Sequence, residues 1–180
     1  PCYAVSWTTT PWTIPANQAI NMHPDLSYAL VDCGDKYLIL GTNLVEDCLK
    51  RYKLEGKIVG ETNGKNLDHV RFMHPFSQLH EGFKRFSPVF LGEYVEATSG
   101  TGVVHSAPAY GLDDFVSCKA NGMTNDQILN PVMGNGVYAD WLPLFGGLNI
   151  WKAQPKIVDT MRVAGVLLNC EMIQHSYMHC

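Results

Sequence analysis

The chain has 180 residues, of which 46% are apolar and 17% are charged. This composition excludes a disordered protein, which would combine low hydrophobicity with high charge, and the length predicts one domain. Thirteen Lys and Arg against 17 Asp and Glu give a net charge of −4, which excludes a protein that coats a nucleic-acid duplex. Binding of a single-stranded end stays open, because it needs only a few contacts.

The ends of the chain and its cysteines bear on where the protein works. No basic stretch followed by an apolar run resembles a signal peptide, and no window reaches the roughly 18 apolar residues of a membrane span. The six cysteines form no CxxC pair, so we expect reduced thiols in the cytoplasm. Because the chain opens without Met and stops within a polar, His-rich run, we expect a piece of a larger polypeptide.

The first third of the chain predicts short strands and one helix. Alternating large residues predict a strand over 3–7, and Pro11 and Pro15 then predict an irregular loop over 10–17. The apolar spacing after Asn43 predicts a helix that continues to Tyr52. Further strands are expected as a meander, at residues 19–22, 27–31 and 37–40.

The rest of the chain is also rich in short β-type runs separated by Gly and Pro. Helices are predicted at 112–120 and 154–164, and a long excursion that contains a Gly134-Asn135-Gly136 turn is predicted at 130–147. Many short strands at about ten-residue spacing indicate a β-rich barrel or sandwich. The strands are expected at residues 57–61, 70–73, 89–91, 94–97 and 102–105.

Residues 7–17, here called the Thr-rich segment, concentrate polar groups at the end of a predicted strand. Its sequence WTTTPWTIPAN holds four hydroxyls, two indoles and an amide. Hydroxyls both donate and accept hydrogen bonds, so the segment is able to hold a carbonyl, a ribose and a water together. The alternative interpretation is a solvated Thr-rich strand with Trp packing.

Residues 100–115, GTGVVHSAPAYGLDDF, form the second unusual segment. Gly100 and Gly102 allow the backbone to approach a ligand closely, and Asp113 and Asp114 fall in the first turn of a predicted helix. These carboxylates would also fit a purely structural role at the positive end of the helix dipole. Adjacent helical residues diverge by about 100°, so at most one of the two carboxylates faces a pocket.

Other catalytic arrangements find little support. His175, His179 and Cys180 lack a fourth ligand at zinc spacing, and the remaining histidines are too scattered to supply one. No GxGxxG or Walker loop opens a helix, and no GxSxG elbow is present. Cys118 has no evident base beside it. We therefore expect no metal and no cofactor in this domain, and no covalent catalysis.

On these residues the chain resembles the editing domain, or connective polypeptide, of isoleucyl-tRNA synthetase. The resemblance rests on the two segments above together with HSYMHC at 175–180, which bracket nearly the whole chain. The triple Thr favours the isoleucyl enzyme over valyl and leucyl relatives, whose loops look like TTRP. Two departures are Ala109-Tyr110, where many relatives have Gly-His, and Met178, where Pro is usual.

The resemblance implies one editing domain over residues 1–180, with a mixed, β-rich fold: a β-barrel-like core of short strands and peripheral short helices. The implied reaction is hydrolysis of mischarged Val-tRNA(Ile). The implied partners are the aminoacylated 3′ end of tRNA(Ile), its valine moiety and the remainder of a parent synthetase, in a cytoplasmic monomer without membrane contact. Alternatives are an editing domain of valyl or leucyl type, and a non-catalytic module that binds the tRNA acceptor end.

The resemblance also assigns site residues. Asp114 matches the acidic residue that binds the α-ammonium of the misattached amino acid, and Thr9 and Thr10 are the further catalytic candidates. His105 matches the residue that shapes the side-chain pocket. The other expected substrate-binding residues are Thr8, Trp12, Thr13, Asn17 and Gly102.

Overall fold

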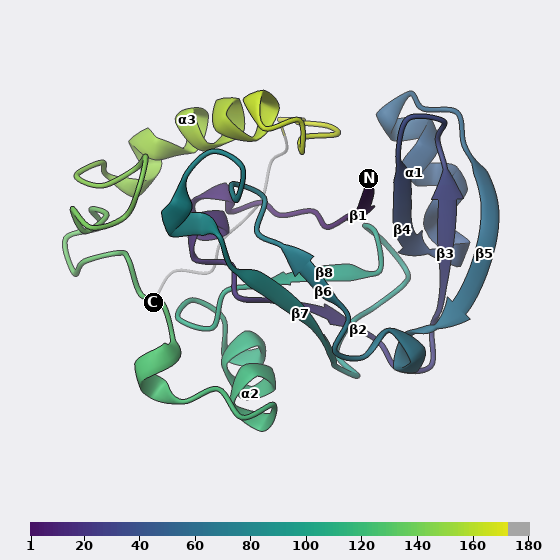
Figure 1. The fold of residues 1–180 in the computed structure, drawn as a ribbon, viewed down its shortest axis with the longest axis horizontal. Coiled ribbons are helices and arrows are strands. Elements are labelled where there is room, and N and C mark those ends of the chain that lie inside the picture. The colour runs from purple at the N-terminus through teal and green to yellow at the C-terminus, as the bar shows by residue number, and fades with distance from the viewer. Residues whose placement is uncertain (173–180) are drawn as a thin grey trace.

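The computed structural model describes residues 1–172, which contain two four-stranded sheets (Figure 1). The first sheet has the order β1-β4-β3-β5, and the second has the order β6-β7-β2-β8. Both sheets are open, so the barrel-like core expected from the resemblance does not close into a barrel within these residues. The strands are β1 (Cys2–Ala4), β2 (Ala19–Met22), β3 (Ser27–Asp32), β4 (Tyr37–Gly41), β5 (Lys57–Asn63), β6 (Arg71–Met73), β7 (Phe86–Leu91) and β8 (Val103–Ser106).

Strand β2 does not join β3 and β4 in a meander, so that prediction was wrong. β3 and β4 pair antiparallel, whereas β2 pairs parallel with β7 and antiparallel with β8. β2 is central in its sheet, and Ala19, Asn21 and Met22 are fully buried. A strand buried in this way needs partners on both edges, and here they come from later parts of the chain.

Three α-helices lie around the sheets (Figure 1): α1 (Val45–Tyr52), α2 (Leu112–Ala120) and α3 (Ile150–Val163). The bounds of α2 confirm the prediction. α3 begins earlier than predicted, because the Asn149 side chain accepts a hydrogen bond from the Trp151 N–H at 3.1 Å and caps the first turn. Short 3₁₀ helices are η1 (Pro11–Ala16), η2 (Thr42–Leu44), η3 (Gly64–Leu67), η4 (Glu81–Phe83) and η5 (Asn125–Gln127).

Three other segments differ from their predictions. The irregular loop predicted over 10–17 contains η1 at Pro11–Ala16, because Pro11 occupies the first helical position, where its missing N–H costs nothing. The strand predicted over 3–7 ends at Ala4, and residues 94–97 contain no strand. The excursion at 130–147 contains the predicted turn, in which the Gly136 N–H bonds the Met133 carbonyl at 2.9 Å.

An aromatic cluster forms the core behind η1. The rings of Phe76 and Phe83 have their centroids 5.4 Å apart, and Phe145 lies 5.5 Å from Phe76. Ile14 of η1 packs into the same cluster, together with Tyr138 and three apolar residues of α3. The Thr-rich segment is therefore supported from behind by a dense apolar core.

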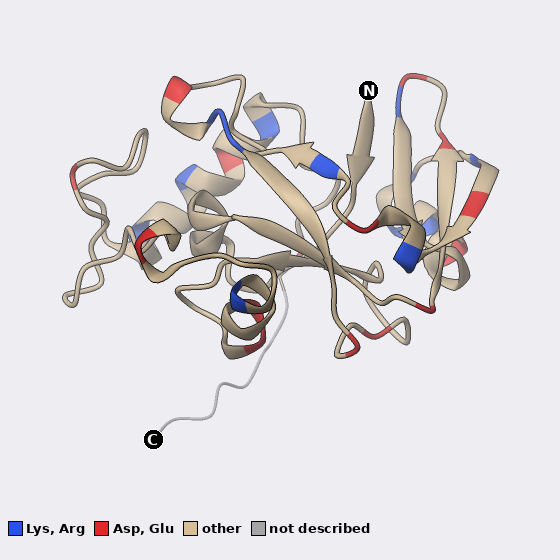
Figure 2. Cartoon of the chain, turned by 60° about the horizontal axis from the view of Figure 1, so that its bottom comes forward, with Lys and Arg blue, Asp and Glu red and all other residues tan. Residues whose placement is uncertain are grey.

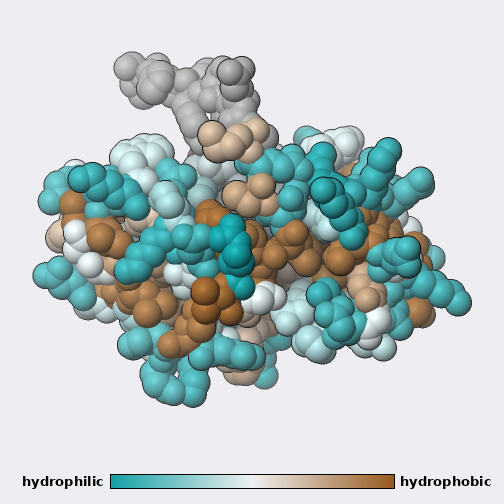
Figure 3. Space-filling model, turned by 90° about the horizontal axis from the view of Figure 1, so that it is seen from above, coloured by the Kyte–Doolittle hydropathy of each residue, from teal (hydrophilic) through white to brown (hydrophobic). Residues whose placement is uncertain are grey.

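The molecular surface is mixed in charge and hydropathy. In the view of Figure 2, acidic and basic residues are interspersed along the ribbon. Figure 3 shows apolar side chains as an interrupted band between hydrophilic ones on the face seen from above. Within residues 1–172, no helix has both the length and the apolar character needed to cross a bilayer.

Candidate active site

The Thr-rich segment orders its own hydroxyls before η1 begins. The Thr8 hydroxyl oxygen accepts from the Thr10 N–H at 3.0 Å and lies 3.2 Å from the Thr10 hydroxyl. The Thr13 hydroxyl donates to the Thr10 carbonyl at 3.0 Å. A tight turn thus brings the Thr8 and Thr10 hydroxyls together and ties the Thr13 hydroxyl to the same turn. Thr9 lies within this turn, and its catalytic role stays a prediction.

His105 of β8 joins the Thr-rich segment through both ring nitrogens. Nε2 lies 2.9 Å from the Thr13 hydroxyl, and Nδ1 lies 2.7 Å from the Asn17 side-chain nitrogen. Asn17 can only donate with that nitrogen, so Nδ1 is the acceptor and Nε2 carries the proton. Burial lowers the pKa of His105 to about 4. The imidazole is therefore neutral near pH 7, with both nitrogens engaged.

Asp114 lies in the first turn of α2 and folds back toward the end of β8. Its carboxylate accepts from the Ala107 N–H at 3.0 Å and shares the single proton of the Ser106 hydroxyl, at 3.3 Å, with the Asn21 side-chain oxygen. Burial raises the pKa of Asp114, the two hydrogen bonds lower it, and the nearby charge of Asp113 raises it. Asp113 itself is exposed. The two carboxylates therefore diverge as predicted, and only Asp114 is held beside β8.

Gly111 makes room for this arrangement. It directly precedes α2, and a Cβ added there would lie 2.7 Å from one carboxylate oxygen of Asp114. The backbone of Gly111 is extended and available to any residue, so its lack of a side chain is what matters. Glycine at this position lets the Asp114 side chain reach the Ala107 N–H.

Sequence reasoning missed a buried polar network beneath the site. Ser106 and Asn21 are both 0% exposed, and the Ser106 hydroxyl bonds the Asn21 side-chain oxygen. The Asn21 amide nitrogen donates to the Ser117 hydroxyl at 2.6 Å, which ties β2 to α2. The available signal was an Asn within the otherwise apolar run of β2. Most buried side-chain amides have hydrogen-bond partners, and Asn21 has one on its nitrogen and one on its oxygen.

Trp12 and Gly102 make contacts other than those that join the threonines, His105 and Asp114. The Trp12 ring packs edge-on against Tyr110, at 5.0 Å between centroids, and borders the aromatic core. Gly102 has a φ of +74°, and a Cβ there would lie 3.2 Å from the Gly41 Cα, so glycine permits both the bend before β8 and its close approach to the end of β4. Substrate contact by either residue stays a prediction.

Two cavities open in the described part of the structure, and neither is lined by His105 or by a threonine. One of about 350 Å³ lies beside α2 and is lined by Pro108, Ala109 and Phe115 with three residues of the 125–130 segment. The other, of about 200 Å³, lies beside Pro15 and Arg85. Among residues 1–172, no three His, Cys, Asp or Glu side chains converge as metal ligands. The predicted His175, His179 and Cys180 cluster, like the HSYMHC motif, lies outside the described residues.

Comparison with known proteins extends over the whole chain. No protein-family model matches, but the chain is 61% identical over 180 residues to the isoleucine–tRNA ligase of Azoarcus sp. (strain BH72). It is 57% identical over 180 residues to that of Cupriavidus pinatubonensis. All of this chain is covered in both alignments, yet the chain spans only 19% of the length of each relative.

Solved structures show the same fold. GlLeuRS-CP1 superposes with a TM-score of 0.73 and 14% identity, over 98% of this chain and 85% of that one. The P. falciparum cytosolic leucyl-tRNA synthetase editing domain, with insertions 1 and 3 deleted, gives a TM-score of 0.64 at 8% identity, over 91% and 78%. The chain therefore belongs to the isoleucine–tRNA ligase family, of which it forms the segment that has the synthetase editing-domain fold.

Proposed function

We propose that this chain hydrolyses the ester of Val-tRNA(Ile), releasing valine and intact tRNA, as the proofreading part of a parent isoleucine–tRNA ligase. The observation that carries the proposal is the half-buried Asp114 carboxylate, held beside the strand that presents His105 to the Thr-rich segment. A carboxylate in this position suits the α-ammonium of an aminoacyl ester. The relationship to isoleucine–tRNA ligases supports the choice of tRNA(Ile) as the carrier.

The need for such a reaction is physical. A pocket that binds isoleucine gains only about 1 to 3 kcal/mol from one additional methylene, and isoleucine against valine is the established worked case of this limit. A second site that accepts valine and rejects isoleucine by size raises the overall accuracy. His105, fixed by Thr13 and Asn17, is a rigid group that is able to set such a size limit.

The chemistry requires positioned water more than a strong base. The ester is already activated, so attack by water on its carbonyl forms an oxyanion that hydrogen-bond donors stabilise. The hydroxyls of Thr8 and Thr10 and the nearby backbone N–H groups are suitable donors. Collapse of the oxyanion expels the ribose oxygen, which takes up the proton that the attacking water has lost and leaves the tRNA intact.

A direct test is deacylation by the parent synthetase of Val-tRNA(Ile), Thr-tRNA(Val) and Ile-tRNA(Ile) in parallel. Preferential release of valine supports the proposal. Preferential release of threonine would instead indicate a valyl-type site. If no amino acid is released above the uncatalysed rate, the result would indicate a non-catalytic module that only binds the acceptor end.

We expect Gly111→Ala to impair deacylation while leaving the fold intact. The new Cβ pushes against the Asp114 carboxylate, which is free to rotate away, so the cost falls on the position of the carboxylate rather than on the backbone. Gly134→Ala is the matched control, because nothing lies within 4 Å of a Cβ at that position. Equal deacylation rates for both variants in the same assay would contradict the assigned position of Asp114.

We also expect prolonged chelation to leave deacylation and the melting temperature unchanged. The reason is the donor set, since the described residues offer no converging group of metal ligands. The measurement compares dialysed protein with and without EDTA. Restoration of a lost activity by added zinc would show that the site uses a metal.

A further inference from the structure

Four backbone carbonyls in and just after η1 are bound by side chains from distant parts of the chain. The Tyr138 hydroxyl donates to the carbonyl of Trp12, and His74 Nε2 donates to that of Ile14 at 3.1 Å. Arg85 supplies the other two hydrogen bonds, to the carbonyls of Pro15 and Asn17. The Ile14 carbonyl also accepts from the Asn17 N–H at 2.9 Å, and the external donors add long-range hydrogen bonds that tie the segment to distant parts of the chain.

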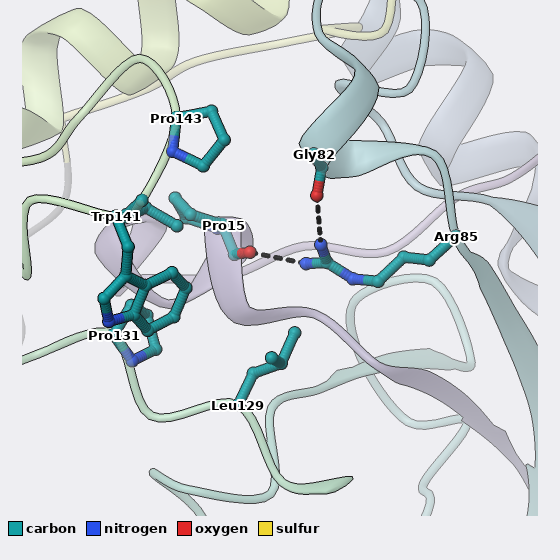
Figure 4. Close-up of a pocket in the computed structure, with 8 residues that line it drawn as sticks. Pro15, Gly82, Arg85, Leu129, Pro131, Trp141 and Pro143 are labelled. Atoms are coloured by element: carbon teal, nitrogen blue, oxygen red, sulfur yellow. Dashed lines mark hydrogen bonds between the residues drawn. The ribbon is translucent and has the colours of Figure 1, made fainter.

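Arg85 forms its pair of bonds with two arms of one planar group. Nη2 donates to the Pro15 carbonyl at 2.6 Å, and Nε donates to the Asn17 carbonyl at 3.1 Å. Figure 4 shows the guanidinium reaching from its strand end toward Pro15, with a further bond to the Gly82 carbonyl. The side chain also lies over the Phe83 ring, 5.5 Å from its centroid.

This cation has no acidic partner in the described part of the chain. None of the ion pairs between residues 1 and 172 includes Arg85. Burial lowers its pKa to about 10, so the guanidinium stays charged at neutral pH. A half-buried charge bound only to carbonyls is retained at an energetic cost. We therefore attribute the role of Arg85 to the positions in which it holds these carbonyls.

That geometry reaches His105 through Asn17. Arg85 fixes the Asn17 carbonyl, and the Ser87 hydroxyl bonds the Asn17 side-chain oxygen. The side-chain nitrogen lies 2.7 Å from His105 Nδ1 and also donates to the carbonyls of Ala19, at 2.9 Å, and Ser106, at 3.3 Å. The amide therefore has little freedom to rotate. Asn17 transmits this restraint to the imidazole, so Arg85 and His105 need not touch.

We propose that Arg85 is a positioning residue that orients His105 through Asn17 and thereby sets the size limit of the amino-acid site. This inference rests on the proposed function and adds a determinant of its specificity. A lysine would not replace Arg85, because a single ammonium lacks the planar fork that spans both carbonyls.

The first test measures the ratio of Val-tRNA(Ile) to Ile-tRNA(Ile) deacylation rates in the parent synthetase. A ratio does not depend on how much protein is folded, so a purely structural role leaves it unchanged. We expect Arg85→Gln and Arg85→Lys to lower the ratio by about tenfold to a hundredfold, as small displacements of a positioned group do. Arg71→Gln is the matched control, because Arg71 also lies over a Phe ring, at 5.0 Å, but is exposed.

Coupling to His105 makes the test specific. In a His105→Ala background, we expect Arg85→Gln to leave the ratio unchanged, because the group that Arg85 positions is gone. An unchanged ratio in the single Arg85→Gln variant, or an equal fall of the ratio in both backgrounds, would overturn the proposal.

A second readout does not depend on catalysis. Diethylpyrocarbonate modifies neutral imidazoles, and its reaction at His105 can be followed by peptide mass relative to the exposed His80. We expect slow modification of His105 in the wild type and faster modification in Arg85→Gln. Equal rates in the two proteins would overturn the positioning role. Absence of Val-tRNA(Ile) deacylation by the wild type would overturn only the proposed function.

Discussion

Asp114→Ala is expected to remove most of the editing activity while the protein stays folded. Removing one partner of a partly buried charge pair costs roughly 2 to 5 kcal/mol, which corresponds to a loss of roughly 30-fold to 5,000-fold in kcat/KM. The loss follows because the substrate ammonium would enter the site without its counter-charge. Deacylation of Val-tRNA(Ile) under single-turnover conditions measures it.

Stability provides an independent check on the same residue. Burial raises the pKa of Asp114, so the folded protein holds the proton more tightly than the unfolded chain does. Between the two pKa values, the free energy of unfolding therefore falls as the pH rises, and the ionised carboxylate lowers stability at neutral pH. Asp114→Asn removes that charge, so we expect a urea midpoint at pH 7 no lower than that of the wild type.

Asp113 is the matched control for both measurements. It lies in the same helical turn but is exposed, so Asp113→Ala should change deacylation little. Equal damage from the Asp113 and Asp114 substitutions would show that the two carboxylates act together or that Asp113 is the anchor.

Local signals in the sequence were enough to predict the elements that depend on neighbouring residues. α2 was predicted with its bounds because its acidic first turn and the Asn121-Gly122 end lie within the helix or beside it. The divergence of Asp113 and Asp114 followed from helical geometry alone. The hydroxyl turn of Thr8 and Thr10, although it depends on residues two positions apart, was not predicted.

These local signals could not predict which distant segments pair with each other. The parallel partner of β2 is β7, far along the chain, and nothing near either strand specifies that register. The bond from Arg85 to Pro15 spans 70 residues, and that from Tyr138 to Trp12 spans 126. An arginine before a strand resembles any surface arginine until its carbonyl partners are known. Candidate site residues could therefore be named from motifs, whereas the distant residues that contact them could not.

His105→Ala tests whether the imidazole excludes isoleucine by size. Both ring nitrogens already bond Thr13 and Asn17, and a pKa of about 4 makes the ring a weak base at neutral pH. These two facts favour a steric role over proton transfer. We therefore expect the variant to keep Val-tRNA(Ile) hydrolysis and to gain hydrolysis of the correct Ile-tRNA(Ile). The gain should approach the roughly 10- to 200-fold that one methylene is worth.

The opposite outcome is equally distinct. If His105 acted as a general base, the same substitution would lower hydrolysis of both esters by roughly 10² to 10⁴-fold. His80→Ala, which removes an exposed imidazole, serves as the control and should change neither rate. Because Asp114 remains in place in the His105 variant, its carboxylate still binds the ammonium of either amino acid. A loss of valine release without any gain on isoleucine would therefore reject the steric role and assign His105 to proton transfer.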